Sequence, residues 1–185
     1  SCALDTAHQA GVTHRDLKPA NIMIQPSGEP VIMDFGLAKL QNSESMITKD
    51  GKLLGTPAYM PPEQVKGRCQ LVGPASDIYS LGAMMYEMLA GRIPFAGKLA
   101  DVLHQIVADA PPPPSEFNTG LDRQLEAICL RAMSKSINDR FPSAVALADA
   151  LRDYLVGRCS LREQRLTTSS DCDVFIALFS AERQF

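Results

Sequence analysis

Four polar residues near the start of the chain have side chains suited to holding a metal ion, accepting a proton and neutralising negative charge. Asp34 and Asn21 provide a carboxylate and an amide oxygen, the kinds of ligand that Mg²⁺ prefers. Asp16 provides a second carboxylate, which can accept the hydrogen bond and then the proton of a hydroxyl group. Lys18 would place a positive charge beside a group on which negative charge develops. The set predicts a site that positions reactants and neutralises charge.

Each of these residues also has an ordinary structural interpretation. An Asp before a hairpin is usually a turn cap, and a Lys beside it is usually a solvated surface charge. Taken singly, those interpretations would be preferred. The ordered set favours chemistry instead: the motif HRDLKPAN at residues 14–21, followed by DFG at residues 34–36.

A short β-hairpin is expected within this set. The apolar run Ile22–Ile24 is followed by a Pro-Ser-Gly turn at residues 26–28 and then by the apolar run Val31–Met33. A hairpin of this kind would bring Asn21 and Asp34 close together. Residues 37–54 then form a polar segment without a helical or strand period, and a loop of that length is often functional.

The rest of the chain is predicted to be mainly helical. Ser76–Ala90 is apolar on nearly every side and stops before Gly91, which is typical of a helix at the centre of a helical domain. A shorter helix at the start of the chain is expected to end at Gly11. For the prolines at 111–114, a stiff connector is preferred over a docking motif. Three further helices fit the apolar spacing: Leu99–Ala108, Leu121–Met133 and Pro142–Val156, the last with Pro142 in its first turn.

Composition narrows the class of protein. The 185 residues are 45% hydrophobic, enough for one ordinary core, and the net charge is −3 with scattered basic residues, so nucleic acid is not expected as a partner. The five cysteines are irregularly spaced and read as reduced thiols of a cytoplasmic protein. The apolar runs are too short to span a membrane.

The motifs resemble those of one family in their order and spacing. Besides HRDLKPAN and DFG, the chain carries GTPAYMPPE at residues 55–63, Asp77 with a following Ser-Leu-Gly at residues 80–82, and Asp139-Arg140. Together they resemble the protein kinase family over residues 1–157, in particular bacterial members. The resemblance implies the mainly α-helical C-terminal (large) lobe of the kinase fold with a small β-hairpin at the catalytic loop.

This resemblance implies a function and a set of roles. It implies a serine/threonine kinase that transfers the γ-phosphate of MgATP to Ser and Thr hydroxyls of protein substrates, with ATP and Mg²⁺ as cofactors. Asp16 and Lys18 would be catalytic, Lys18 also contacting ATP and being typical of the serine/threonine branch. Asn21 and Asp34 would hold the metal, and Met23 would form the floor beneath the adenine ring.

The resemblance also implies several structural contacts. His14 and Phe35 would stack, and Glu63 and Arg140 would form a buried ion pair. Asp77 would tie the catalytic loop to its helix, although a helix-capping role competes with that interpretation. Arg15 and Lys39 would receive a phosphate on Thr48, with an unmodified polar loop as the alternative.

Part of the family pattern is absent from this sequence. No glycine-rich loop, strand lysine or helix glutamate precedes residue 14, so we expect a fragment that binds MgATP poorly and transfers little phosphate. The alternative is a non-catalytic interaction module built on the kinase fold. Residues 1–157 would form the lobe, and residues 158–185 a tail or the start of a further domain, in which residues 173–176 faintly resemble the first strand of Toll/interleukin-receptor-type domains.

Overall fold

The computed structural model describes residues 3–35 and 57–162, and in that part of the chain the protein is mostly helical with one two-stranded sheet. This confirms the predicted mainly α class and the hairpin. In chain order, the helices and strands are α1 (Ala3–Gln9), β1 (Ile22–Ile24), β2 (Pro30–Ile32), α2 (Pro62–Val65), α3 (Pro74–Ala90), α4 (Leu99–Ala108), α5 (Arg123–Ala132) and α6 (Ala144–Arg162).

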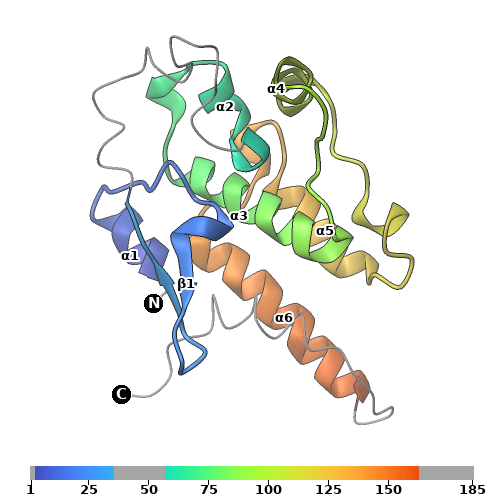
Figure 1. The fold of residues 1–185 in the computed structure, drawn as a ribbon. Helices are drawn as coiled ribbons and strands as arrows, with labels where there is room; N and C mark the ends of the chain where they lie inside the picture. The colour runs from blue at the N-terminus through green and yellow to red at the C-terminus, as the bar shows by residue number, and fades with distance from the viewer. Residues whose placement is uncertain (1–2, 36–56, 163–185) are drawn as a thin grey trace.

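Helix α3 forms the centre of the fold, as its uniform apolarity predicted. Figure 1 shows it running through the middle of the molecule, with α5 packed against it, α6 below it and α2 and α4 above it. Every residue from Ser76 to Tyr86 is buried, so α3 has no solvent-facing side over three turns. Its first turn is closed by Ser76, whose Oγ accepts the N–H of Gly73 at 3.1 Å, and it ends at Gly91 in the left-handed conformation (φ 67°).

A glycine allows α3 and α5 to approach closely. A Cβ atom built on Gly82 would lie 2.8 Å from Cβ of Ala132 and 2.9 Å from Cγ of Met133. The thiol of Cys129 donates to the Gly82 carbonyl at 3.5 Å, and burial raises the pKa of this thiol far above its usual value. Cys129 is therefore an inert core residue, and the contact helps to fix α3, the helix that carries the buried Ser76, Asp77 and Ser80.

The hairpin stands apart from the helical core. Its antiparallel strands pair Ile22 with Ile32 and Ile24 with Pro30, and Gly28 takes the positive φ of 85° that the turn requires. Figure 1 shows the two strands projecting from the body of the molecule beside α1. Met23 and Ile24 are each 47% exposed, so the sheet contributes little to the core.

Two helices begin later than predicted. Helix α5 begins at Arg123 because the carboxylate of Asp122 accepts the N–H of Gln124 at 2.8 Å and so caps it. The prediction that Pro142 lies in the first turn of the last helix was wrong: α6 begins at Ala144, because Ser143 Oγ accepts the N–H of Ala146 at 3.0 Å. Helix α6 continues to Arg162, so the boundary proposed at residue 157 falls inside it.

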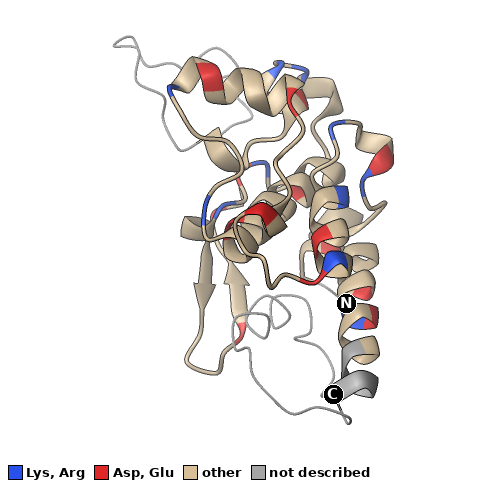
Figure 2. Ribbon diagram, turned by 90° about the vertical axis from the view of Figure 1, so that its right-hand side faces the viewer, with Lys and Arg blue, Asp and Glu red and all other residues tan. Residues whose placement is uncertain are grey.

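In the described part of the chain, charged residues of both signs are mixed along the helices, and the apolar stretches are short. Figure 2 shows acidic and basic positions interspersed along the helices. None of the helices in the described ranges is long and apolar enough to cross a membrane. Nor do those ranges contain a cluster of three or more His, Cys, Asp or Glu side chains that could hold a metal ion by themselves.

Candidate functional site

The segment that carries Asp16 is anchored directly to the central helix. Asp77 of α3 is buried and accepts two main-chain hydrogen bonds, from His14 N–H at 2.8 Å and from Arg15 N–H at 2.9 Å. The predicted tie between Asp77 and this loop is confirmed. Since α3 begins at Pro74 and has Gly73 as its N-cap, Asp77 does not cap the helix, although its charge still lies in the favourable first turn.

A third donor on Asp77 was missed by the sequence analysis. Nε2 of His8, on α1, lies 2.8 Å from Asp77 Oδ2, so the carboxylate joins α1, the loop and α3. Only the helical spacing of His8 is visible in the sequence, because its partner is 69 residues away. Three hydrogen bonds compensate the cost of burying this carboxylate.

The backbone is unusual at two positions next to the polar set. Arg15 (φ 68°) and Asp34 (φ 54°) are the non-glycine residues with positive φ in the described part of the chain. Asp tolerates this left-handed region, whereas Arg rarely adopts it. The conformation at Arg15 costs roughly 1–3 kcal/mol. The hydrogen bond from its N–H to Asp77 helps to hold it in place.

Asp16 lies within a local network. Its Oδ2 is 3.0 Å from the ammonium of Lys18, and its main-chain carbonyl accepts a 2.7 Å hydrogen bond from Nδ2 of Asn21. The Asp16 N–H donates to Nδ1 of His14 at 3.3 Å, while His14 Nε2 lies 2.8 Å from the Met33 carbonyl. This pattern assigns the neutral His14 proton to Nε2. The structure thus brings together Asp16, Lys18 and Asn21.

His14 also connects the loop to the segment after the hairpin. Its ring lies 5.0 Å from that of Phe35, centroid to centroid, with the planes tilted by 51°. This spacing is typical of a favourable aromatic pair. The predicted contact is confirmed, and it links the segment that bears Asp16 to the segment that bears Asp34.

The hairpin places the two candidate metal ligands at one end. The Met33 N–H donates to the Asn21 carbonyl at 2.8 Å, directly beyond the paired strands, so Asp34 follows at the same end as Asn21. Nδ2 of Asn21 is used by Asp16, which leaves its Oδ1 as the acceptor, and Asp34 is exposed. One carboxylate and one amide oxygen fit Mg²⁺, which usually keeps waters and shares its remaining positions with phosphate oxygens.

Met23 lies away from Asp16. It occupies the middle of β1 opposite Val31 and is nearly half exposed, so its side chain is free to contact a ligand. Neither Met23 nor Asp34 lines the pocket that contains Asp16. The predicted residues therefore form two groups, one around Asp16 and one at the hairpin, and Asn21 connects them.

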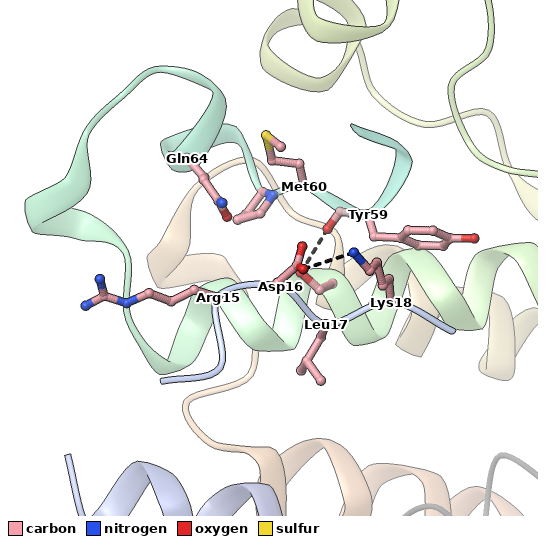
Figure 3. Close-up of a pocket in the computed structure, with 9 residues that line it drawn as sticks. Arg15, Asp16, Leu17, Lys18, Tyr59, Met60 and Gln64 are labelled. Carbon is pink, nitrogen blue, oxygen red and sulfur yellow. Dashed lines mark hydrogen bonds and ion pairs between the residues drawn. The ribbon is translucent and has the colours of Figure 1, made fainter. Parts of the chain in front are cut away.

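A pocket of about 260 Å³ opens beside Asp16 (Figure 3). The sequence analysis did not assign a role to the residues that close it from the other side. Ser80 Oγ donates to the Tyr59 carbonyl at 2.8 Å, and the Tyr59 hydroxyl donates to Glu87 at 2.6 Å. Burial and the Glu87 carboxylate raise the pKa of Tyr59 well above its usual value. The pocket is lined by Arg15, Asp16, Leu17, Lys18, Tyr59, Met60, Pro61, Gln64 and Ser80.

The predicted ion pair behind the pocket is confirmed. Arg140 Nη1 and Nη2 each lie 2.8 Å from one carboxylate oxygen of Glu63, and both residues are buried. Arg140 also donates to the Ser134 and Ala75 carbonyls, and Ser76 Oγ donates to Glu63 at 2.6 Å. Burial alone would raise the pKa of Glu63, but the hydrogen bonds from Arg140 and Ser76 outweigh it and lower the pKa.

One predicted interaction cannot be placed. Lys39 and Thr48, the predicted partner and phosphorylation site of the Arg15 hypothesis, lie outside the described residues, as do the tail residues from 163 onward. These predictions remain predictions.

Comparisons with known proteins agree with the geometry. The family model described as protein kinase domain matches residues 1–153. The probable serine/threonine-protein kinase PknB of Bifidobacterium longum is 40% identical over 157 residues, which cover 84% of this chain and 22% of that protein. PknB of Mycobacterium tuberculosis is 40% identical over 153 residues, covering 81% of this chain and 24% of that protein. The chain thus spans about a quarter or less of these curated relatives.

Solved structures show the same similarity. The apo form of PpkA-294 superposes with a TM-score of 0.62 at 29% identity, covering 80% of this chain and 49% of that one. Rad53 1–466 in complex with AMP-PNP superposes with a TM-score of 0.60 at 28% identity, covering 78% and 35% respectively. The match over residues 1–153, the curated relatives and the anchored Asp16 loop lead to one conclusion: this chain belongs to the protein kinase family.

Proposed function

We propose that this chain is the C-terminal lobe of a serine/threonine protein kinase, and that the complete protein transfers the γ-phosphate of MgATP to Ser and Thr hydroxyls of other proteins in the cytoplasm. One observation carries the proposal. The Asp16 carboxylate lies 3.0 Å from the Lys18 ammonium and lines a pocket. The loop that carries Asp16 is hydrogen-bonded to Asp77 of the central helix α3. Relatives named as serine/threonine kinases support the same activity.

Each residue near Asp16 would have a distinct role. Asp16 accepts a hydrogen bond from the substrate hydroxyl and then takes its proton, since a carboxylate within hydrogen-bonding distance of a hydroxyl can act as a general base. Lys18, already paired with Asp16, contributes positive charge beside the transferring group. The Asn21 hydrogen bond to the Asp16 carbonyl holds the two residues at a fixed separation.

The hairpin residues would serve the nucleotide. Asn21 and Asp34 would hold Mg²⁺, which when bound neutralises charge on the phosphates of ATP. Met23, nearly half exposed on β1, would lie beneath the adenine ring. Protein kinases use ATP and a divalent metal in general, and the chemistry of this donor set fits that use. A non-catalytic role is disfavoured because Asp16, Lys18, Asn21 and Asp34 are all intact.

The test uses the full-length product of the gene that encodes this chain. Transfer from γ-labelled ATP to proteins should depend on Mg²⁺, and Asp16→Asn should lower its rate about 10²- to 10⁴-fold while nucleotide affinity is largely kept. Asp34→Asn should also lose Mg²⁺-dependent nucleotide binding. Asp153→Asn, on the exposed side of α6, is the matched control and should behave as the unsubstituted protein.

Two results would overturn the proposal. Absence of Mg²⁺-dependent transfer by the unsubstituted protein would remove the kinase activity itself. Equal loss of nucleotide affinity in the Asp16 and Asp34 variants would show that the division between the hydroxyl side and the metal side is wrong.

A further inference from the structure

Most polar side chains around the pocket are already committed to one another. Asp16 pairs with Lys18, and Ser80 Oγ donates to the Tyr59 carbonyl. The Tyr59 hydroxyl is held by Glu87. Gln64 differs: within the described part of the chain its carboxamide makes no hydrogen bond, although its backbone is fixed by the N–H bond to the Pro61 carbonyl at 3.0 Å. A carboxamide has an N–H₂ donor group and an acceptor oxygen, so the Gln64 side chain brings to the pocket hydrogen-bonding groups without partners among the described residues.

The orientation of Gln64 supports a role in the pocket. Figure 3 shows its carboxamide directed from α2 toward the space beside Asp16, whereas the Arg15 guanidinium points away from that space and the Tyr59 ring leads outward. Gln64 is partly buried and follows Glu63, whose carboxylate is held by both ends of the Arg140 guanidinium. The Glu63–Arg140 pair therefore holds the short helix α2, and with it the backbone of Gln64, in a fixed position.

The size and openness of the site indicate what Gln64 would contact. The roughly 260 Å³ of empty space beside Asp16 includes open solvent, so the site does not enclose a small molecule, and it leaves access for an extended segment of polypeptide. Such a segment presents main-chain N–H groups that lose water on binding and need an acceptor. Asp16 is reserved for the hydroxyl, and Ser80 Oγ is buried while it donates to the Tyr59 carbonyl, which leaves Gln64 Oε1 as the accessible uncharged side-chain acceptor.

We propose that Gln64 is a specificity-determining residue whose Oε1 accepts a main-chain N–H of the acceptor polypeptide, from a residue adjacent to the hydroxyl-bearing one. This inference rests on the proposed kinase function. It predicts that an acceptor lacking that N–H, through N-methylation or a proline, leaves Oε1 without a partner and is selected against.

The experiment crosses a protein substitution with a peptide substitution. The full-length protein first selects its best acceptor from a peptide library with a fixed central threonine. Each peptide bond next to the threonine is then N-methylated in turn. In the unsubstituted protein, one N-methyl peptide should lose about tenfold in kcat/KM, which is the value of one hydrogen bond of about 1.4 kcal/mol. Gln64→Leu should lose about tenfold on the parent peptide and nothing more on that N-methyl peptide.

Two variants make the result specific. Gln64→Glu keeps an acceptor oxygen and should remain sensitive to the same N-methyl group. Gln70→Leu removes a carboxamide from an exposed position outside the pocket and should match the unsubstituted protein on every peptide. For Gln64→Leu the loss should appear mainly in KM, because the interaction forms in the ground state and the transition state alike.

The outcomes separate this inference from the proposed function. Transfer activity combined with equal N-methyl sensitivity in the unsubstituted and Gln64→Leu proteins overturns the role of Gln64 alone. Insensitivity of the unsubstituted protein to every N-methyl peptide does the same. Absence of Mg²⁺-dependent transfer to any acceptor overturns the kinase function and this inference with it.

Discussion

The buried carboxylates on α2 and α3 and the exposed hairpin make different contributions to the candidate site. Asp77 and Glu63 are 1% and 4% exposed and make several hydrogen bonds each, whereas Met23 is 47% exposed and Asp34 also faces solvent. The proposed hydroxyl side of the site is therefore anchored to the core. The proposed nucleotide side is carried on a two-stranded sheet whose position depends on a few contacts, among them the His14–Phe35 ring pair.

This difference separates stability from ligand binding. Residues that hold the Asp16 loop and α2 stabilise the folded structure as a whole, so their loss should be detected in unfolding measurements. Residues on the hairpin should affect ligand affinity while leaving unfolding nearly unchanged. The predictions below test this contrast.

The largest expected effect is at the Glu63–Arg140 pair. Removing one partner leaves the other charge buried and unpaired, so Glu63→Gln or Arg140→Met should lower the free energy of unfolding by about 3–5 kcal/mol. An exposed pair would cost less than about 1 kcal/mol. Denaturant melts of both single variants and the double variant provide the measurement. Small, additive losses would mean that the pair does not anchor α2.

The same pair predicts a direction for acid sensitivity. The folded-state pKa of Glu63 is lowered from its ordinary value of 4.5, so its stabilising contribution is complete above that value and is lost as pH falls through the folded pKa. Stability of the unsubstituted protein should therefore fall more steeply below about pH 4.5 than that of Glu63→Gln. Parallel pH profiles from thermal melts would contradict this assignment.

A smaller effect is expected where α3 meets α5. Gly82→Ala places a Cβ within 2.9 Å of both Ala132 and Met133, and such overpacking costs about 1–3 kcal/mol, partly offset by a helix-propensity gain of up to about 1 kcal/mol. The net result should be destabilisation. Gly157→Ala, in α6 with nothing within 4 Å of the new Cβ, should instead stabilise by up to about 1 kcal/mol. If chemical denaturation gave both variants a higher free energy of unfolding than the unsubstituted protein, α3 and α5 could move apart at Gly82 without cost.

The same contrast explains what the sequence could and could not predict. Apolar spacing predicted α3, α4 and the hairpin because those signals are local, and the motifs predicted the Asp77 and Glu63–Arg140 contacts through the resemblance alone. The start of α6 was misplaced because a Ser143 cap competes with a proline start. His8 and Gln64 could not be assigned roles, since their significance depends on partners or spaces formed only by the folded chain.

The smallest effect on stability, and the sharpest test of the contrast, is expected on β1. Met23→Gln should change the free energy of unfolding by less than about 0.5 kcal/mol, because the side chain is already nearly half in water. In the full-length protein it should nevertheless raise the KM for ATP about fivefold, since covering the exposed half of a methionine with an adenine ring is worth about 1 kcal/mol.

Ile24→Gln is the matched control: Ile24 is equally exposed, but adjacent strand residues point to opposite faces, so its substitution should leave the KM unchanged. Urea melts and ATP titrations of initial rate give the two quantities. Equal increases in KM for both variants would show that the hairpin acts as a whole and not through the Met23 face. A stability loss above about 1 kcal/mol for either variant would show that the hairpin belongs to the same cooperative core as α3.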